Sequence, residues 1–382
     1  MKPTSDIIND IIPGRPDGLE VAEQITPKIT VEQTVSFSDG RKPNSEPEKP
    51  QEYKRPQRLS DFIGNSEIRE QLQTTVQAIR KMNRRLPNAI FFGAAGTGKT
   101  TLAKILGNEV DQPCITITGN SINKQEDLMK VIWRISDIYY GTGKTPILFI
   151  DEIGSISFSK DLDQTIWLPL IEDFVFYNNL EGKIIEYKDT AYKILTGEYK
   201  VPEFTVIGAT TDIANLNPAL RRRFPLHFFM KPYTPEELQK ILLQYSGKKN
   251  IPLTEPAALN IAKRSRFTPA TALSYLEACE YYQVGNSLPD INDEVVNRQM
   301  SVQKIDSNGL KWEDMEVLRT LAEFPKGMGL KNLASAAGIS ADVVEEIVEP
   351  FLKSCKLMAV VNKRIITQKG IEYIQKGENN GR

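Results

Sequence analysis

The chain has 382 residues and a formal net charge of −1, which excludes an overall basic field for nucleic acid and leaves only local clusters to contact it. Three widely spaced cysteines and one histidine, His227, argue against a disulfide framework or a structural zinc site and favour a cytoplasmic location. Apolar runs fall short of the roughly 20 residues of a membrane span, so we expect no membrane partner.

Residues 1–52 are expected to form a mostly disordered tail. They are rich in Pro, Glu, Ser, Thr and Lys and carry only short apolar patches, too little to offset the entropy of ordering. A docking peptide at residues 7–12 is the alternative. The first ordered helix is expected from Glu67 to about Met82, with Ser66 as its N-cap. The basic residues that follow it, up to Arg85, are interpreted as a solvated helix end.

The most informative stretch is a glycine-rich loop. From Gly93 to Thr100 the sequence fits G-x-x-x-x-G-K-[ST], behind a short apolar run and ahead of a helical one. Strand, loop and helix in that order are typical of a P-loop, where backbone N–H groups and a helix N-terminus converge on phosphate oxygens. Gly96 and Gly98 permit the close backbone approach. Lys99 is expected at the β- and γ-phosphates, and Thr100 on Mg²⁺. A glycine-rich turn without a ligand would leave the lysine and the hydroxyl unexplained.

Polar residues follow two further apolar runs. The run at residues 146–152 ends in Asp151 and Glu152, and the run at residues 204–211 ends in Thr211. Such runs suit buried parallel strands, and open α/β sheets bind ligands at the carboxyl ends of their strands. Asp151 is therefore expected to hold Mg²⁺ through its waters, and Glu152 to polarise the water that attacks the γ-phosphate. Thr211 is expected to bond the γ-phosphate or that water.

Three adjacent arginines, Arg221, Arg222 and Arg223, end the short helical segment that comes next. Like charges repel one another, so a purely structural role is awkward, although a solvated cluster is the usual alternative. The functional hypothesis is that one arginine points at the γ-phosphate of a neighbouring subunit, where a guanidinium stabilises developing charge.

The remainder of the chain is predicted to be a helical unit followed by a winged helix. Helices are expected at about 235–247, 255–265, 269–283 and 291–300. Thr234 is the expected N-cap of the first of them, and Pro235 its first helical residue. Gly338 and Ser340 have the spacing of a helix-turn-helix, and residues 357–367 predict two short strands around a turn. The predicted domains are thus a tail (1–52), an ATPase domain (53–232), a helical lid (233–305), a winged-helix domain (306–376) and a short C-terminal tail (377–382).

The charges of the winged helix indicate how it would meet DNA. The presumed recognition helix carries acidic residues, which phosphates would repel: Asp342, Glu345, Glu346 and Glu349. Residues 353–369 contain five basic residues and no acidic one. DNA binding is therefore expected through the wing, at Lys363 and Arg364, to the phosphate backbone and without sequence preference. A winged helix that docks protein is the alternative.

Taken in order, these motifs resemble the RuvB family, AAA+ ATPases that drive branch migration of Holliday junctions. The resemblance covers residues 54–374. Besides the P-loop and the acid pair, it rests on the segments Ile-Glu-Asp-Phe (171–174), Gly-Ala-Thr-Thr (208–211), Leu-Arg-x-Arg-Phe (220–224), Tyr-Thr-Pro-Glu-Glu-Leu (233–238) and Glu-Pro-Phe-Leu (349–352).

The resemblance implies an α/β fold, an AAA+ P-loop NTPase domain with a parallel sheet, followed by an all-α lid and a C-terminal winged-helix domain. It implies ATP and Mg²⁺ as cofactors, and nucleotide contacts at Arg55, Gly96, Lys99, Thr100, Thr101, Glu172, Asp173, Phe174 and Tyr233. Arg223 matches the family's trans-acting arginine finger, with Arg221 as the second candidate. The implied assembly is a homo-hexameric ring on branched or duplex DNA, with a RuvA-like junction-binding protein at residues 175–203.

The chain departs from the family pattern at four places. Ala270 stands where the family's Thr-Pro-Arg has its arginine, with Arg264 and Arg266 nearby in sequence, and Gly154 stands in place of a histidine. The segment at residues 175–203 is longer and of different composition, and the wing is shorter. The leading hypothesis is an ATP-driven motor for Holliday-junction branch migration. An AAA+ switch or adaptor that remodels a protein partner is the alternative, and a clamp-loader-like ATPase the third.

Overall fold

The structure, a computed structural model, describes residues 19–21, 56–156 and 164–379. The chain divides into two compact units, Met1–Lys231 and Pro232–Arg382. Arg55 lies outside the described residues, as do most of the predicted N-terminal tail and residues 380–382. Among the described helices, none has the length and apolar character that crossing a bilayer requires.

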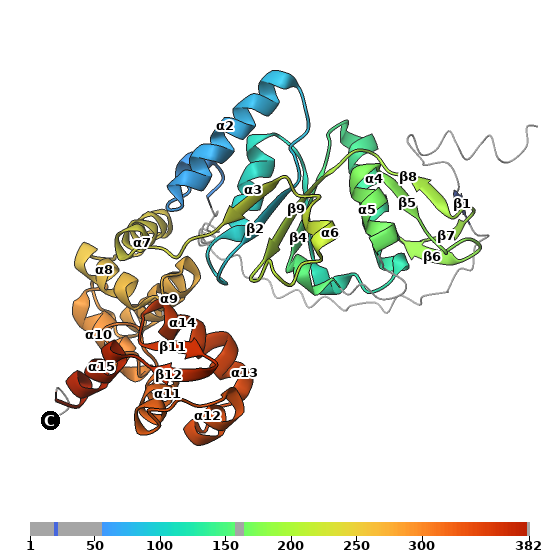
Figure 1. The fold of residues 1–382 in the computed structure, drawn as a ribbon. Coiled ribbons are helices and arrows are strands. Elements are labelled where there is room, and N and C mark those ends of the chain that lie inside the picture. Colours follow the sequence, from blue (N-terminus) through green and yellow to red (C-terminus); the bar gives the residue numbers. More distant parts are fainter. Residues whose placement is uncertain (1–18, 22–55, 157–163, 380–382) are drawn as a thin grey trace, which may run out of the picture. The chain divides into compact units, whose positions relative to one another are not determined.

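The centre of the first unit is a five-stranded parallel sheet in the order β10-β2-β9-β4-β3. Figure 1 labels three of its strands, β2, β9 and β4. Its strands are β2 (Ala89–Phe92), β3 (Cys114–Thr118), β4 (Ile147–Asp151), β9 (Thr205–Thr210) and β10 (Leu226–Phe229). The predicted parallel sheet with the P-loop strand inside it is confirmed. The edge strand β10 is not predicted from the sequence, because only Phe228 in it is buried and its apolar pattern is weak.

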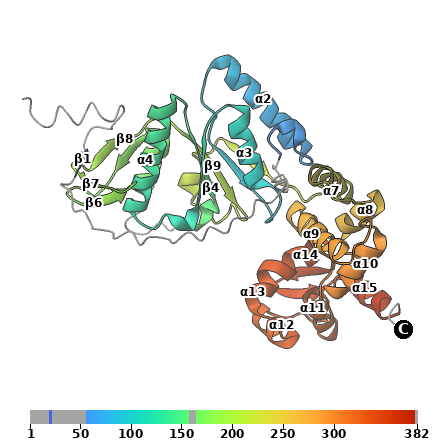
Figure 2. The ribbon, with the colours of Figure 1, turned by 180° about the vertical axis from the view of Figure 1, so that it is seen from behind.

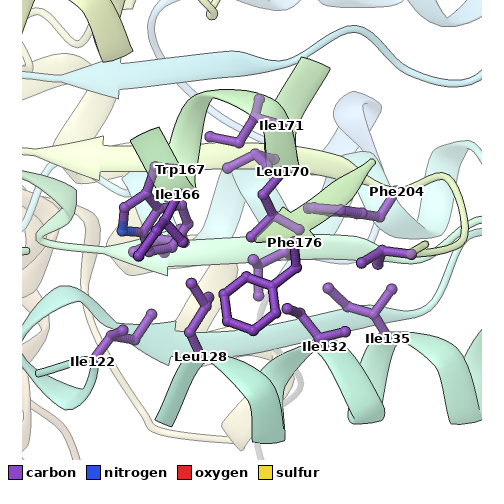
Figure 3. Packing of buried hydrophobic residues seen from close by; sticks show 14 of the residues in the cluster. Ile122, Leu128, Ile132, Ile135, Ile166, Trp167, Leu170, Ile171, Phe176 and Phe204 are labelled. Atoms are coloured by element: carbon purple, nitrogen blue, oxygen red, sulfur yellow. The ribbon is translucent and has the colours of Figure 1, made fainter. Parts of the chain in front are cut away.

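Helices cover both faces of this sheet, because its strands are apolar on both sides. On one face lie α2 (Ser66–Met82) and α3 (Lys99–Glu109), packed with Phe91 and Phe149. On the other lie α4 (Gln125–Thr142) and α5 (Gln164–Glu172), packed with Ile90 and Ile150. Figure 3 shows part of this second cluster, with Leu128 and Ile132 of α4 across from Leu170 of α5. The short helix α6 (Pro218–Arg221) adds Leu220 to it. Single 3₁₀ turns occupy Leu59–Asp61, Gly119–Ser121 and Ile153–Ser155.

A small β-insertion separates α5 from β9. It consists of β5 (Val175–Tyr177), β6 (Ile184–Tyr187), β7 (Thr190–Ile194) and β8 (Glu198–Lys200), with β5 paired to β8 and β6 to β7. Figure 2 shows the insertion beside α4. Trp133 of α4 contacts the rings of Tyr187 and Tyr192 in the insertion. The free side of β7 pairs antiparallel with β1 (Leu19–Val21), so three residues of the predicted disordered tail form a strand.

The second unit begins with four helices, α7 (Pro235–Lys249), α8 (Glu255–Arg264), α9 (Pro269–Gly285) and α10 (Asp293–Val302). Thr234 and Glu237 form a capping box at α7, with Pro235 in the first turn as the sequence predicts. These helices share a hydrophobic cluster of their own, which we call the lid core.

A winged helix completes the second unit. Its helices are α11 (Trp312–Glu323), α12 (Leu330–Ala337), α13 (Ala341–Val343), a π-helical turn (Val344–Val348), α14 (Glu349–Ser354) and α15 (Gln368–Asn379). Its strands β11 (Met358–Val361) and β12 (Lys363–Ile366) pair antiparallel around Asn362. Gly338 ends α12 with a φ of 68°, and Ser340 accepts the N–H of Val343, so the predicted helix-turn-helix and wing are confirmed.

Candidate nucleotide site

The P-loop connects the carboxyl end of β2 to the first turn of α3. Gly93, Gly96 and Gly98 have φ values of 139°, 75° and 95°, a region that favours glycine. At Gly93 there is also no space for a side chain, since a Cβ would lie 2.6 Å from the carbonyl oxygen of Met230. The loop therefore needs these glycines for its shape, and that shape leads directly into a helix N-terminus.

Lys99 is buried inside this loop. Its Nζ donates hydrogen bonds to the carbonyl oxygens of Gly93, at 2.7 Å, and Ala94, at 2.9 Å. Burial lowers the pKa of Lys99, while the charges of Asp151 and Glu152 oppose that shift. The ammonium is thus held by bonds to backbone carbonyls that a phosphate oxygen can replace.

Thr100 and Asp151 join the P-loop helix to the end of β4. Thr100 Oγ1 donates to Asp151 Oδ2 at 2.9 Å, and the other carboxylate oxygen accepts the backbone N–H of Glu152 at 3.1 Å. A hydroxyl and a carboxylate are hard oxygen donors of the kind Mg²⁺ prefers, so this pair fits the predicted metal ligands. Glu152, directly after β4, has a φ of 52° and an exposed side chain.

The two threonines at the end of β9 differ in their environment. Thr210 is buried, and its Oγ1 bonds the backbone N–H and carbonyl of Asp212. Thr211 is exposed at the same edge of the sheet as Asp151. Gly154 lies close by, and a Cβ there would be 3.3 Å from Thr210 Oγ1. The hydroxyl that faces outward is therefore that of Thr211, the residue singled out from the sequence.

A second group of predicted residues lies at the opposite end of the sheet. Asn88, just before β2, donates from Nδ2 to the carbonyl oxygen of Arg223 at 3.2 Å. Arg85 donates to the carbonyl oxygen of Phe204, just before β9, at 3.2 Å, and its guanidinium lies 5.1 Å from the ring centroid of Phe174. These contacts place Phe174 and Arg223 at the amino ends of the strands. The P-loop is at the carboxyl ends, at least about 13 Å away along β2 at roughly 3.3 Å per residue.

This amino-end cluster (Arg85, Asn88, Glu172, Phe174 and Arg223) is held together by an ion pair. Arg223 Nε lies 2.6 Å from Glu172 Oε1, with the side chains 29% and 44% exposed. Phe174 packs edge-on against Phe204, with their ring centroids 5.6 Å apart. Asp173, the middle residue of the predicted Glu-Asp-Phe contact, is exposed. The predicted nucleotide contacts therefore divide into two sets that one chain cannot bring to the same phosphate.

Two members of the amino-end cluster were missed in the sequence. Asn88 also accepts the backbone N–H of Val206 at 2.8 Å, so it ties β9 to the loop that carries Arg223. The sequence signal that could have identified Asn88 is its position as a polar residue directly before the apolar strand β2. Arg85 is not part of a solvated helix end: it is half-buried, and burial lowers its pKa, opposed by Glu203.

The remaining predicted nucleotide residues lie in separate places. Thr101 is in the first turn of α3, directly after the P-loop. Tyr233 belongs to the second unit, where its ring is buried in the lid core and its backbone N–H donates to the carbonyl oxygen of Phe267. Ala270 is exposed near the start of α9. Arg264 and Arg266 are both occupied by contacts inside the second unit, so neither side chain is free to replace the missing lid arginine.

The two predicted DNA contacts of the wing differ from each other. Lys363 is exposed. Arg364 is turned inward, because its Nε bonds Glu349 Oε2 at 2.7 Å and the two side chains are 13% and 11% exposed. A guanidinium committed to a carboxylate inside the domain is not available to phosphate, so Arg364 has a structural role, and of the two predicted contacts only Lys363 has an exposed side chain.

Comparison with known proteins places these features in a family. Residues 54–230 match the family described as the Holliday junction DNA helicase RuvB P-loop domain, and residues 307–375 match the RuvB C-terminal winged helix domain. The chain is 32% identical over 323 residues to the Holliday junction branch migration complex subunit RuvB of Fervidobacterium nodosum, covering 84% of this chain and 88% of that one. It is 31% identical to the subunit of Lawsonia intracellularis, with 84% and 89% covered. The solved RuvB branch migration motor of Thermotoga maritima is similar with a TM-score of 0.69 and 28% identity, covering 84% of this chain and 98% of that one.

Proposed function

The chain belongs to the RuvB family, and from that membership we propose that it is an ATP-driven motor that moves the branch point of four-way DNA junctions. The observation that carries the proposal is that one chain pairs a P-loop site, where Lys99 is held in the loop and Thr100 bonds Asp151, with a winged helix that exposes the lysines Lys356 and Lys363. ATP hydrolysis supplies the free energy, and the winged helix supplies contact with DNA that does not depend on sequence.

ATP hydrolysis is assigned to the residues in and beside the P-loop. Lys99 exchanges its bonds to Gly93 and Ala94 for phosphate oxygens, and the N-terminus of α3 adds its partial positive charge. Thr100 and Asp151 would hold Mg²⁺, which neutralises charge on the phosphates when bound. Glu152 accepts a proton from the attacking water, and Thr211 orients that water or the γ-phosphate.

The position of Arg223 supports assembly into a ring. Because the amino-end cluster and the P-loop are at opposite ends of one sheet, Arg223 serves the nucleotide of an adjoining copy of the chain. There its guanidinium stabilises charge that develops on the transferred phosphoryl group. Glu172, Asp173 and Phe174 are presented by the same face and contact the same neighbouring nucleotide. The family resemblance sets the expected number of copies at six.

DNA contact is assigned to the wing. Lys363 and Lys356 are exposed and approach phosphates, while Arg364 supports the wing from inside. The β-insertion at residues 175–203 is the proposed docking site for a RuvA-like junction-binding protein. It exposes apolar side chains that a partner can cover, with Ile184 59% and Tyr177 47% exposed.

The test is ATP turnover with a synthetic four-way junction, with a linear duplex of equal length, and without DNA. A branch-migration motor hydrolyses ATP fastest with the junction. The variant Lys363→Ala with Lys356→Ala should lose this stimulation and bind DNA with a smaller salt dependence, by about 0.9 in logarithmic slope per lost phosphate contact. Equal turnover under all three conditions contradicts the proposal.

A second candidate function, a nucleotide switch that remodels a protein partner, is favoured by one observation. The lid has Ala270 in place of an arginine. The two arginines nearest to it in sequence are engaged in other contacts, Arg264 with Asp306 and Arg266 with Asp314. A lid that reads the nucleotide weakly suits slow turnover and a long-lived bound state. Junction-stimulated turnover that depends on Lys363 rules this function out as the main one.

A further inference from the structure

Arg266 reaches from the lid into the winged helix. It stands in the loop between α8 and α9, with a φ of 51°, and its Nη2 donates to Asp314 Oδ1 at 3.0 Å. Asp314 is on α11, the first helix of the winged helix. The Arg266 side chain is 12% exposed and that of Asp314 is 1% exposed. The second carboxylate oxygen accepts the backbone N–H of Lys311 at 2.8 Å, so both oxygens of Asp314 are used.

The same guanidinium touches two more parts of the winged helix. Its carbon lies 4.0 Å from the ring centroid of Phe351 on α14, which is close cation–π stacking. Nη2 also lies 3.3 Å from the carbonyl oxygen of Ile347, in the π-helical turn. One lid side chain therefore contacts α11, the π-helical turn and α14 together, which we call the arginine clasp (Arg266, Asp314 and Phe351).

A second set of bonds ties down the connection between lid and winged helix. Arg264 Nε donates to the carbonyl oxygen of Asp306 at 3.1 Å, and the Asp306 carboxylate accepts the backbone N–H groups of Asn308 and Leu310 and the hydroxyl of Tyr373. Gly309 passes so close to Arg264 that a Cβ would lie 2.5 Å from its carbonyl oxygen. These contacts hold the segment between the lid and the winged helix, residues 306–310, against Arg264 of the lid.

We propose that the arginine clasp makes the lid and the winged helix move as one body, and that Arg266 is the positioning residue through which nucleotide-driven movement of the lid is delivered to the wing on DNA. Separating the two would leave the buried Asp314 carboxylate without its oppositely charged partner, which is strongly unfavourable, although its bond to the backbone N–H of Lys311 would remain. Burial already raises the pKa of Asp314, with Arg266 opposing that shift. The second half of the proposal rests on the proposed function, whereas the first half does not.

The proposal explains what Arg266 does in a chain whose lid has Ala270. The charge of Arg266 is committed to the contact between the lid and the winged helix, so Arg266 is not a substitute nucleotide sensor. Replacing Arg266 should therefore leave ATP affinity and the rate of ATP hydrolysis nearly unchanged. It should lower the amount of branch migration obtained per ATP hydrolysed.

The test compares the full-length chain with the double variant Arg266→Met with Asp314→Asn, which removes both charges and leaves no buried charge unpaired. Arg319→Ala is the matched control, because Arg319 pairs with Glu316 within α11 and does not cross to the lid. The readouts are basal ATP turnover, junctions branch-migrated per ATP hydrolysed, and calorimetric unfolding. We expect unchanged turnover, roughly five- to tenfold less migration per ATP, and a separate unfolding transition for the winged helix. The control should behave as the unmodified chain in all three readouts.

Migration per ATP equal to that of the unmodified chain overturns the transmission role, and unfolding without a separate winged-helix transition overturns the clasp. If the double variant does not fold, Arg266→Lys carries the same test. It keeps a charge near Asp314 but loses the flat contact with Phe351, and a two- to threefold loss of migration per ATP is expected. If the unmodified chain does not migrate junctions at all, the proposed function fails, and the calorimetric result still decides whether the clasp exists.

Discussion

Replacing Arg364 with Ala should destabilise the winged helix instead of merely weakening DNA binding. Arg364 Nε lies 2.7 Å from Glu349 Oε2, in a pair whose side chains are 13% and 11% exposed, and Glu345 adds a longer contact at 3.8 Å. Removing one partner of a buried ion pair costs about 3–5 kcal/mol, since the other charge is left desolvated. Both side chains keep some exposure, and Lys353 Nζ remains 3.5 Å from Glu349 Oε1 after the change. We therefore expect a loss at the lower limit of this range, about 3 kcal/mol, in the free energy of unfolding of this domain.

The assay is hydrogen exchange of the backbone amides of β11 and β12, which reports the local free energy of opening. The matched control is Lys363→Ala, which changes the net charge equally but removes an exposed side chain. It should change the free energy of unfolding by less than about 0.5 kcal/mol. Adding Glu349→Ala to Arg364→Ala should restore part of the loss. If Arg364→Ala leaves exchange unchanged but lowers the salt dependence of DNA binding, the guanidinium is free for phosphates and the reasoning is refuted.

Three further predictions concern the nucleotide. Lys99→Ala should weaken ATP binding at least about tenfold, measured by titration with a fluorescent ATP analogue, because a charged hydrogen-bond donor to phosphate is lost. Glu152→Gln should retain ATP but slow single-turnover hydrolysis by about 10²–10⁴-fold, and full-rate hydrolysis would move the base role to another group. Arg223→Ala should lower turnover about a thousandfold or more, and mixing with Lys99→Ala chains should restore part of it. No recovery in any mixture would count against an arginine that acts on a neighbour.

Features with a local pattern could be predicted from the sequence. The P-loop was identified because Gly93, Lys99 and Thr100 lie within eight residues of one another. The lid helices and the helix-turn-helix were found for the same reason, since capping residues such as Thr234, Pro235 and Ser340 mark their starts. Each of these signals depends on short-range geometry that the residue types dictate.

Features that depend on pairing between distant segments could not be predicted. By its charge alone, Arg364 belongs with the basic residues of the wing. Its partner Glu349 is on α14, and only the fold brings the two side chains together. The division of the nucleotide residues into two clusters depends on strand order and direction, which no local pattern gives. Arg266 likewise looked like a neighbour of Ala270 and proved to face the winged helix through Asp314.

The most direct test of the proposed function is branch migration of a synthetic four-way junction by the purified chain, with labelled strands and ATP. The account predicts that the junction is converted to duplex products in the presence of ATP and Mg²⁺, alone or faster with a junction-binding protein. It also predicts that the Glu152→Gln variant binds the junction but yields no products. Products that form equally without ATP, or no products under any of these conditions while ATP is hydrolysed, would contradict it.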